Sequence, residues 1–497
     1  MISNHLPVYI LILLLISAVT TPAIKPSSKK FRPKLVGTLT IASLLALTMF
    51  IVVWTNGPFY YNFGNWDSVI GIEFFVDEYT SLFVLAVLLI SLLIIIFSLE
   101  DILHDIPKEK TPHYYTLMLL MVFSMLGMIM TNDLFNLYVF MEILSLTSCG
   151  VISIKRNKAN IMASFKYLML GTIGSVSILL GIAMLYMVTG HLNMGATSQT
   201  ISSVWQMYPR NILISLSFIL TGLGLKAAIF PLHVWLPDAH SAAPTPSSAI
   251  LSGIVIKIYA FSMIKILFRV IGIDIIKAIS INEYLTYFAV ISIVMGSVFA
   301  IGQKDIKRLL AYSSVSQIGY VFLGIGIATE MGLVAGMYHI IAHAMMKSTL
   351  FLSAGAVIYR TGIRKVNEFD GLGYELPLTL GAFSIAALGM IGIPGVNGFM
   401  SKWYLGLAAF EIGKPIFIIF ILISSFLNAV YFLPIVISAF LKESNRREQI
   451  MIRDDIPFTM KAPLVVLGAA CIVTGLFPNI IVNVIQRALP TFMTFVF

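Results

Sequence analysis

The sequence predicts an all-α polytopic membrane protein, and three observations support this fold class. Hydrophobic residues make up 58% of the 497 residues and charged residues only 11%, with a mean hydropathy of +0.94, whereas soluble domains carry about 25% charged residues. Apolar stretches of membrane-spanning length recur along the whole chain. Prolines and ionisable residues interrupt a few of these stretches, as in transport proteins.

About fourteen helices are expected, because a spanning helix needs about 20 apolar residues. The first apolar stretch lacks a preceding positive region and is followed by one, so we expect a retained helix and not a cleaved signal. Helices four and five are separated only by residues 131–133. The predicted spans are residues 6–24, 35–54, 79–99, 114–130, 133–153, 163–189, 212–230, 246–268, 284–303, 308–328, 333–358, 377–396, 415–441 and 463–487.

The loops predict an orientation with both termini outside. Lys and Arg concentrate in the loops that follow odd-numbered helices, including residues 25–34 and the charged loop 442–461. The opposite loop 55–78 contains neither residue type. Positive residues favour the cytoplasmic side. The net charge of +9 is therefore explained by loop topology, and no nucleic-acid partner is expected.

Two helices are predicted to be broken within the membrane. Pro231 interrupts the seventh helix and Pro394, among glycines, interrupts the twelfth. Paired interruptions in corresponding halves are typical of transporters built from inverted repeats. We therefore expect N-terminal helices 1–3 in residues 1–113, one five-helix repeat in 114–270, a second in 271–441, and a charged loop with helix 14 in 442–497.

Seven ionisable residues are predicted to lie inside the membrane and form a proton relay. Ionisable residues at membrane depth usually mark an ion path, and histidine, with an unperturbed pKa near 6.5, exchanges protons readily. Three of the residues follow each other at i, i+4 and i+8 on one face of helix 11. The predicted relay consists of Glu142, Lys226, Lys257, His339, His343, Lys347 and Lys402.

Structural alternatives remain open for each of these residues. Glu142 and Lys226 can form a static ion pair, and Lys257 or Lys402 can serve a structural role. His339 can be a hydrogen-bonded interior histidine. Long lysines such as Lys347 can extend towards the membrane interface. A further group of ionisable residues lies near helix ends, and most of them are expected to act as solvated caps or to form salt bridges in loops. These residues are Asp133, His233, Asp238, His240, Lys304, Asp305 and Lys307. Lys166 is expected at the membrane edge.

Other chemistry is not indicated by the sequence. It contains no phosphate-binding glycine motif for a nucleotide. Cys149 and Cys471 have no C-x-x-C partner, so no disulfide, iron–sulfur centre or other cofactor is expected. His339 and His343 lack the glutamate of an H-E-x-x-H motif, and no metal site is predicted.

Several long motifs resemble one known family. The stretches Asn132–Glu142, Lys226–His240, Ala243–Ala249, Asp305–Tyr320 and His343–Lys347 are similar to the antiporter-like subunits of respiratory complex I, membrane-bound hydrogenases and Mrp-type cation/proton antiporters. The resemblance covers roughly residues 70–440. It implies fourteen helices, two inverted repeats and a hydrophilic Glu–Lys–Lys/His–Lys axis. It also implies that the protein works with other membrane subunits of a larger complex.

Within this family the region around Lys402 looks most like the D-type member of the Mrp antiporters, because complex I members carry glutamate at that point. The expected function is therefore ion translocation in a multisubunit Na⁺/H⁺ antiporter, with H⁺ and Na⁺ as ions. The alternative is a proton-pumping component of a redox complex, whose redox centres would lie on other chains. The expected location is the lipid bilayer of a prokaryotic cytoplasmic membrane.

Overall fold

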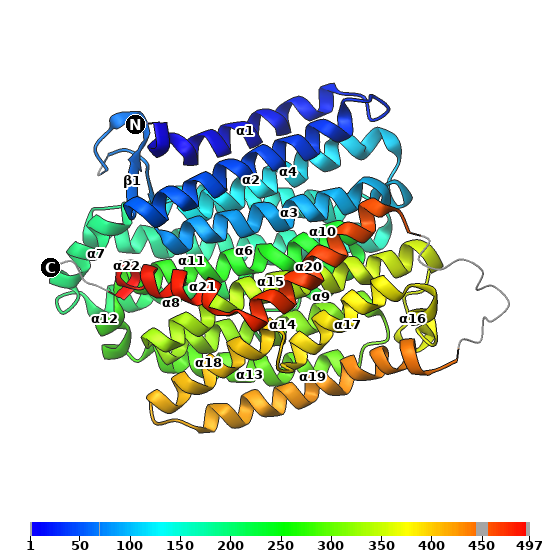
Figure 1. The fold of residues 1–497 in the computed structure, drawn as a ribbon. Helices are drawn as coiled ribbons and strands as arrows, with labels where there is room; N and C mark the ends of the chain where they lie inside the picture. The colour runs from blue at the N-terminus through cyan, green and yellow to red at the C-terminus, as the bar shows by residue number, and fades with distance from the viewer. Residues whose placement is uncertain (1, 69, 444–455, 494–497) are drawn as a thin grey trace.

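The structure is a computed structural model that describes residues 2–68, 70–443 and 456–493. It is a bundle of long helices lying side by side, with connecting segments gathered at its two ends (Figure 1). Within the described residues, 13 helical segments are long and apolar enough to cross a membrane. The prediction of an all-α polytopic membrane protein is confirmed.

The first half of the chain forms a β-hairpin, β1 (Phe59–Asn62) with β2 (Glu73–Val76), and helices α1 to α11. Side-chain caps begin several helices: Asp77 accepts a hydrogen bond from the backbone N–H of Thr80 at 2.7 Å, and Asp133 accepts one from that of Asn136 at 2.6 Å. The helices are α1 (Leu6–Thr20), α2 (Phe31–Asn56), α3 (Glu78–Asp105), α4 (Thr111–Met130), α5 (Leu134–Ser153), α6 (Lys158–Thr189), α7 (Met194–Val204), α8 (Pro209–Ala227), α9 (Leu236–Ala242), α10 (Thr245–Ile250) and α11 (Ile256–Ile264).

Two wide π-helical segments, Leu251–Val255 and Lys265–Ile271, flank α11. The second half follows with helices α12 (Ile273–Ala278), α13 (Ile281–Ile301), α14 (Ile306–Ile327), α15 (Glu330–Thr361), α16 (Leu372–Glu375), α17 (Pro377–Ile391), α18 (Asn397–Glu411), α19 (Ile416–Leu441), α20 (Phe458–Leu476), α21 (Asn479–Ala488) and α22 (Pro490–Met493).

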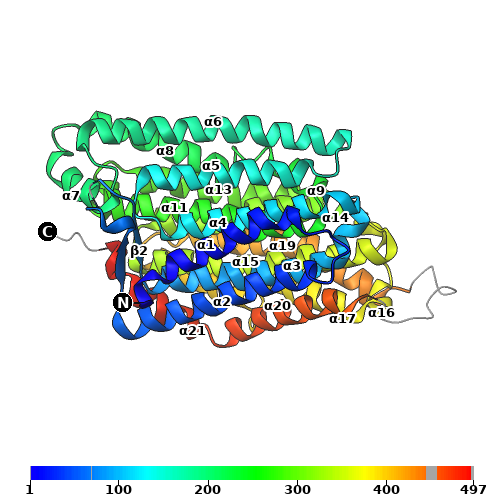
Figure 2. The ribbon, with the colours of Figure 1, turned by 90° about the horizontal axis from the view of Figure 1, so that it is seen from above.

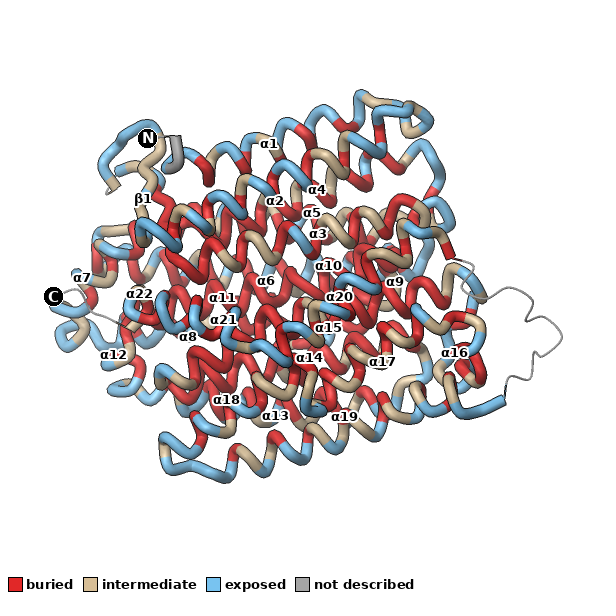
Figure 3. The backbone as a smooth tube through the Cα atoms, viewed as in Figure 1, coloured by how far each residue is buried: buried red, intermediate tan, exposed pale blue. Residues whose placement is uncertain are grey.

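Three segments form the centre of the bundle. The span Thr245–Ile271 is entirely buried, and α14 and α15 are almost entirely buried. Figure 3 shows this core in red, while the outer helices alternate between buried and exposed faces. Seen from above, α6 runs along one edge of the bundle and α20 with α21 along the opposite edge (Figure 2). The polar side chains of the central helices are therefore shielded from lipid by the outer helices.

Both broken helices are present, and they cross the bundle in opposite directions. The chain runs from α8 to α9 towards the end that holds α16, and it runs from α17 to α18 away from that end (Figure 1). The side chain of Arg364, which follows α15, donates to the carbonyl oxygen of Ser241 in α9 at 3.1 Å, so α9 and α15 end on the same side of the bundle. Opposite directions are what inverted repeats require.

Several predicted boundaries differ from the structure. The final span ends at Leu476, because Pro478 follows, and α21 forms a separate helix instead of continuing to residue 487. The predicted twelfth span ends at Ile391 and not at 396. The loops 55–78 and 190–211 contain the β-hairpin and α7. Most of the charged loop 442–461 lies outside the described residues.

Candidate functional site

Glu142 and Lys226 face each other across α5 and α8. The Nζ of Lys226 lies 3.5 Å from Oε1 of Glu142 and donates a hydrogen bond to Oγ of Ser145 at 2.6 Å. The hydroxyl of Ser175 in α6 donates to the same carboxylate oxygen. The Lys226 side chain is 3% exposed and that of Glu142 is 32% exposed. The two residues therefore form a partly buried ion pair with one open side.

The break after α8 places Lys226 in the last helical turn. Ala228 adopts a left-handed conformation with φ of 58°, which ends the helix. The indole N–H of Trp235 donates to the carbonyl oxygen of Leu225 at 2.9 Å, and so satisfies one of the groups left free at the helix end. The helix terminus also supplies negative partial charge beside the lysine ammonium.

Lys257 and Lys347 lie in the fully buried centre. The Nζ of Lys257 donates to the carbonyl oxygen of Ser252, which belongs to the π-helical segment before α11. The Nζ of Lys347 donates to the carbonyl oxygen of Leu310 at 2.7 Å and to the hydroxyl of Ser313. Neither lysine has a carboxylate partner among the described residues. Each is held by polar oxygens alone.

Two histidines on α15 extend this polar centre. The rings of His339 and His343 stack with centroids 5.5 Å apart, and Nδ1 of His339 is 2.8 Å from Oγ of Ser401. Neither ring nitrogen of the fully buried His343 has a hydrogen-bond partner among the described residues. Helix α11, which carries Lys257, packs against α15. The centre thus joins α11 to α15.

Lys402 caps the helix that precedes the second break. Its Nζ donates to the carbonyl oxygens of Met390 at 2.9 Å and Ile391 at 2.8 Å, and to Oγ of Ser425 at 3.0 Å. The first two groups end α17, so the ammonium satisfies carbonyls that the helix leaves free. The ring of Tyr320 lies between Lys402 and His339: its centroid is 5.1 Å from Nζ of Lys402 and 5.5 Å from the ring centroid of His339. The predicted terminal lysine therefore faces the polar centre.

The seven predicted residues lie on α5, α8, α11, α15 and α18 and form one polar band, in which Glu142 is partly exposed and the other six are buried. One aromatic ring links its first pair to the centre: the ring centroid of Tyr259, two residues after Lys257, lies 5.7 Å from Nζ of Lys226. Besides His343, buried side chains with polar atoms that have no protein partner in the described part of the chain include Gln317 and Ser348. Buried polar groups of this kind are usually satisfied by internal water.

The residues predicted to lie near helix ends fall into two groups in the structure. Asp305, which caps α14 and pairs with Arg364 at 2.8 Å, fits the predicted helix-end role. His240 and Lys307 do not, because they are 0% and 3% exposed. Lys307 donates to the carbonyl oxygen of Ala243 at 2.5 Å. The sequence shows that these residues lie near helix ends, but it does not show that neighbouring helices bury them.

Two buried residues were missed by sequence reasoning. Lys265 is fully buried and donates to the carbonyl oxygens that end α4, those of Ile129 at 3.1 Å and Thr131 among them. Asp101 on α3 is 5% exposed and interacts electrostatically with Lys307. The only sequence signal for either residue is a charge inside an apolar helix. Among the described residues, no group of three or more His, Cys, Asp or Glu is placed to hold a metal ion.

The chain is similar to known membrane proteins along most of its length. Residues 131–428 match the family described as "NADH:quinone oxidoreductase/Mrp antiporter, TM". The chain is 36% identical to the N-type subunit of an NADH-quinone oxidoreductase from Desulforudis audaxviator, over 98% of this chain and 99% of the relative. It is 28% identical to the D-type subunit of an Na⁺/H⁺ antiporter from Alkalihalophilus pseudofirmus, over 74% of this chain and 73% of the relative.

Two solved structures share the fold. A chain of the membrane-bound sulfane sulfur reductase, an archaeal respiratory membrane complex, superposes with a TM-score of 0.90, at 30% identity and 98% coverage of both chains. A chain of the Mrp complex from Dietzia sp. DQ12-45-1b gives a TM-score of 0.88 at 23% identity, covering 99% of this chain and 98% of that one. Both neighbours are subunits of multisubunit membrane complexes. The chain therefore belongs to the NADH:quinone oxidoreductase/Mrp antiporter family of membrane subunits.

Proposed function

We propose that this chain translocates protons along the band from Glu142 to Lys402 as one subunit of a larger membrane complex. The observation that carries the proposal is the set of four buried lysines and two buried histidines, of which only Lys226 has a carboxylate partner among the described residues. Burying uncompensated charge is expensive. Polar side chains kept at such cost within a membrane usually serve an ion path.

Each residue has a definite task in this mechanism. The carboxylate of Glu142 stabilises the ammonium of Lys226, and a change in that contact releases or recaptures a proton. Lys257, His339, His343 and Lys347 exchange protons in the centre, where internal water is expected to connect them. Lys402 is the terminal carrier. The relay crosses from the proposed first repeat, residues 114–270, to the second, residues 271–441.

The energy source has two candidates, each supported by a specific observation. The motif around Lys402 and the 28% identity to a D-type antiporter component support an Mrp-type Na⁺/H⁺ antiporter, in which the ion gradient drives transport. The 36% identity to an N-type oxidoreductase component and the fold shared with a respiratory membrane complex support a redox-driven pump. Both candidates use the same residues, and the redox centres of the second would lie on partner chains.

Proton transport by this axis is tested with Lys226→Ala in everted membrane vesicles that contain the whole complex. The native complex should show either a cation-dependent or a redox-driven pH gradient. We expect this gradient to disappear in the variant, because the first proton carrier is lost. Lys414→Ala is the matched control, since this lysine pairs with Glu283 on the surface at 3.5 Å and both side chains are 50% exposed. Full activity of Lys226→Ala would refute the axis.

The energy source is tested by extracting the native complex in mild detergent and identifying its chains by mass spectrometry. Small membrane subunits without metalloproteins would support the antiporter, whereas iron–sulfur, nickel or flavin subunits would support the redox pump. We place the chain in a prokaryotic cytoplasmic membrane with both termini outside, which the distribution of Lys and Arg supports. Reporter fusions to each terminus test this orientation.

A further inference from the structure

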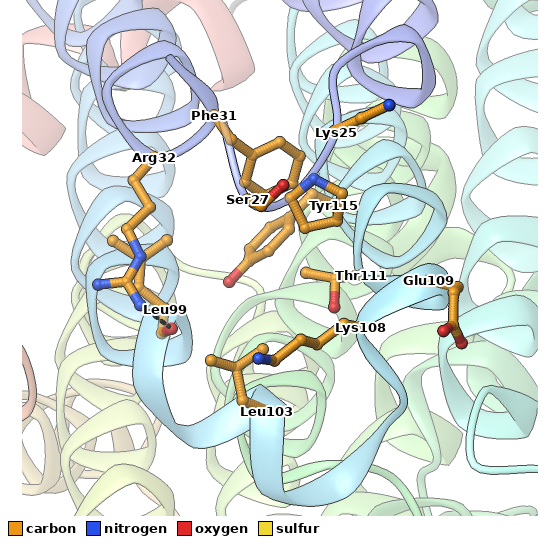
Figure 4. A pocket seen from close by; sticks show the side chains of 11 residues that line it. Lys25, Ser27, Phe31, Arg32, Leu99, Leu103, Lys108, Glu109, Thr111 and Tyr115 are labelled. Carbon is orange, nitrogen blue, oxygen red and sulfur yellow. Dashed lines mark hydrogen bonds between the residues drawn. The ribbon is translucent and has the colours of Figure 1, made fainter. Parts of the chain in front are cut away.

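A pocket unrelated to the proton axis opens at one end of the bundle. It lies between the α1–α2 connection, the start of α2, the end of α3 and the start of α4. Its volume is about 420 Å³, which is within the range of small-molecule sites. Figure 4 shows the side chains that line it, with the rings of Phe31 and Tyr115 in the middle.

The pocket has a charged rim and an apolar interior. Lys25, Arg32 and Lys108 supply positive charge at its rim, while Phe31, Leu99, Leu103 and Tyr115 supply apolar surface (Figure 4). Glu109 also lines the pocket and contributes one negative charge. Lys25, Lys108 and Glu109 are exposed to solvent. The lining residues alone therefore carry a net positive charge.

Arg32 is already oriented by its neighbours. One of its terminal nitrogens donates to Glu100 at 2.7 Å, and the other is 3.4 Å from the carbonyl oxygen of Leu99. These contacts leave further N–H groups of the guanidinium, which has five. The Arg32 side chain is 49% exposed, so those groups are accessible. A guanidinium with free donors is well suited to a phosphate oxygen.

The position of the pocket in the molecule indicates which class of ligand it binds. All its lining residues lie at the ends of spanning helices or in the short connections between them, which is where lipid headgroups meet a membrane protein. The adjoining connection adds Lys29 and Lys30 and contains no acidic residue. A free phosphate ion would use the rim but not the apolar interior, whereas a phospholipid matches both.

We propose that this pocket binds an anionic phospholipid, with the headgroup phosphate at Arg32 and Lys108, further positive charge from Lys25 at the rim, and the start of an acyl chain against Phe31 and Leu103. Basic pockets between helices on the positively charged side of a membrane protein bind anionic lipids in this way. The proposal does not depend on the proton axis, because none of the seven relay residues lines the pocket.

Native mass spectrometry of the detergent-extracted complex tests the proposal. The probes are phosphatidylglycerol, phosphatidylcholine and inorganic phosphate, added separately to wild type and to the double variant Lys25→Gln with Lys108→Gln. Each basic residue strengthens attachment to an anionic lipid about five-fold, so we expect the double variant to bind phosphatidylglycerol roughly 25-fold more weakly. Lys414→Gln removes an exposed lysine outside both the pocket and the connection beside it, and this variant should bind like wild type.

Thermal melting of the intact complex gives a second readout. Phosphatidylglycerol should raise the melting temperature of wild type, and neither phosphatidylcholine nor inorganic phosphate should do so. Equal binding of the two lipids would overturn the headgroup assignment, and stabilisation by phosphate alone would assign the rim to a free anion. Unchanged phosphatidylglycerol binding by a double variant that still assembles would overturn the proposal as a whole.

Discussion

Removing the charges of Glu142 and Lys226 singly and together measures how strongly the pair is coupled. At 3.5 Å and an effective dielectric constant of about 20, the attraction between two unit charges is about 5 kcal/mol. The Glu142 side chain is 32% exposed, so screening reduces this value. With this screening we expect a coupling free energy of about 2 kcal/mol, within the range measured for residues in direct contact.

The assay is a double-mutant cycle on the free energy of unfolding of the intact complex in mixed detergent–dodecyl sulfate micelles. The variants are Glu142→Gln, Lys226→Met and the double substitution. The losses of stability in the two single variants should add up to more than the loss in the double variant. The reason is that each single variant leaves one charge without its partner. Effects that add to within about 0.5 kcal/mol would show that the two groups are independent, and would refute the paired-carrier reasoning.

Three further predictions follow from the buried contacts. Lys402→Met leaves the helix-end carbonyl of Ile391 without a donor, whereas that of Met390 keeps the side-chain amide of Asn428 at 3.0 Å. We expect this variant to cost about 1–3 kcal/mol in a detergent unfolding assay and to abolish transport in vesicles. His343→Gln replaces a ring that makes no hydrogen bond to the described protein, so the melting temperature should change little. The transport rate should fall at least about ten-fold, because a proton carrier is lost. Comparable losses of stability and transport would indicate a structural role instead. Asp77→Asn keeps a side-chain acceptor for the α3 cap but breaks the buried ion pair with Arg269, and it should destabilise the complex by about 3–5 kcal/mol. Combining Asp77→Asn with Arg269→Met should recover much of that loss.

Local sequence signals predicted the features that depend on neighbouring residues. The α4–α5 boundary follows from Asp133, which caps α5 in the structure as its position suggests. The two breaks follow from Pro231 and Pro394, and the alignment of His339, His343 and Lys347 follows from helical spacing. In contrast, the end of the final span was missed although Pro478 marks it, because the apolar pattern continues beyond the proline.

Features that depend on distant contacts were not predictable from the chain alone. Lys265 is recognisable as a helix-end cap only when α4, more than 130 residues earlier, is placed beside it. His240 and Lys307 lie near helix ends in the sequence, yet neighbouring helices bury them. Burial of such groups is decided by tertiary packing, which composition and periodicity do not report.

The hydrogen bonds of Lys402 determine which neighbour must change when this lysine loses a proton. A lysine ammonium has three N–H groups, and this one meets three acceptors, Met390, Ile391 and Ser425. The neutral amine has two N–H groups and one lone pair. Since carbonyls only accept, the hydroxyl of Ser425 is the partner able to reverse and donate to that lone pair. Proton loss at Lys402 is therefore expected to turn one hydroxyl around, and Ser425→Ala, assayed by the proton transport rate, should slow the step; an unchanged rate would exclude this reversal.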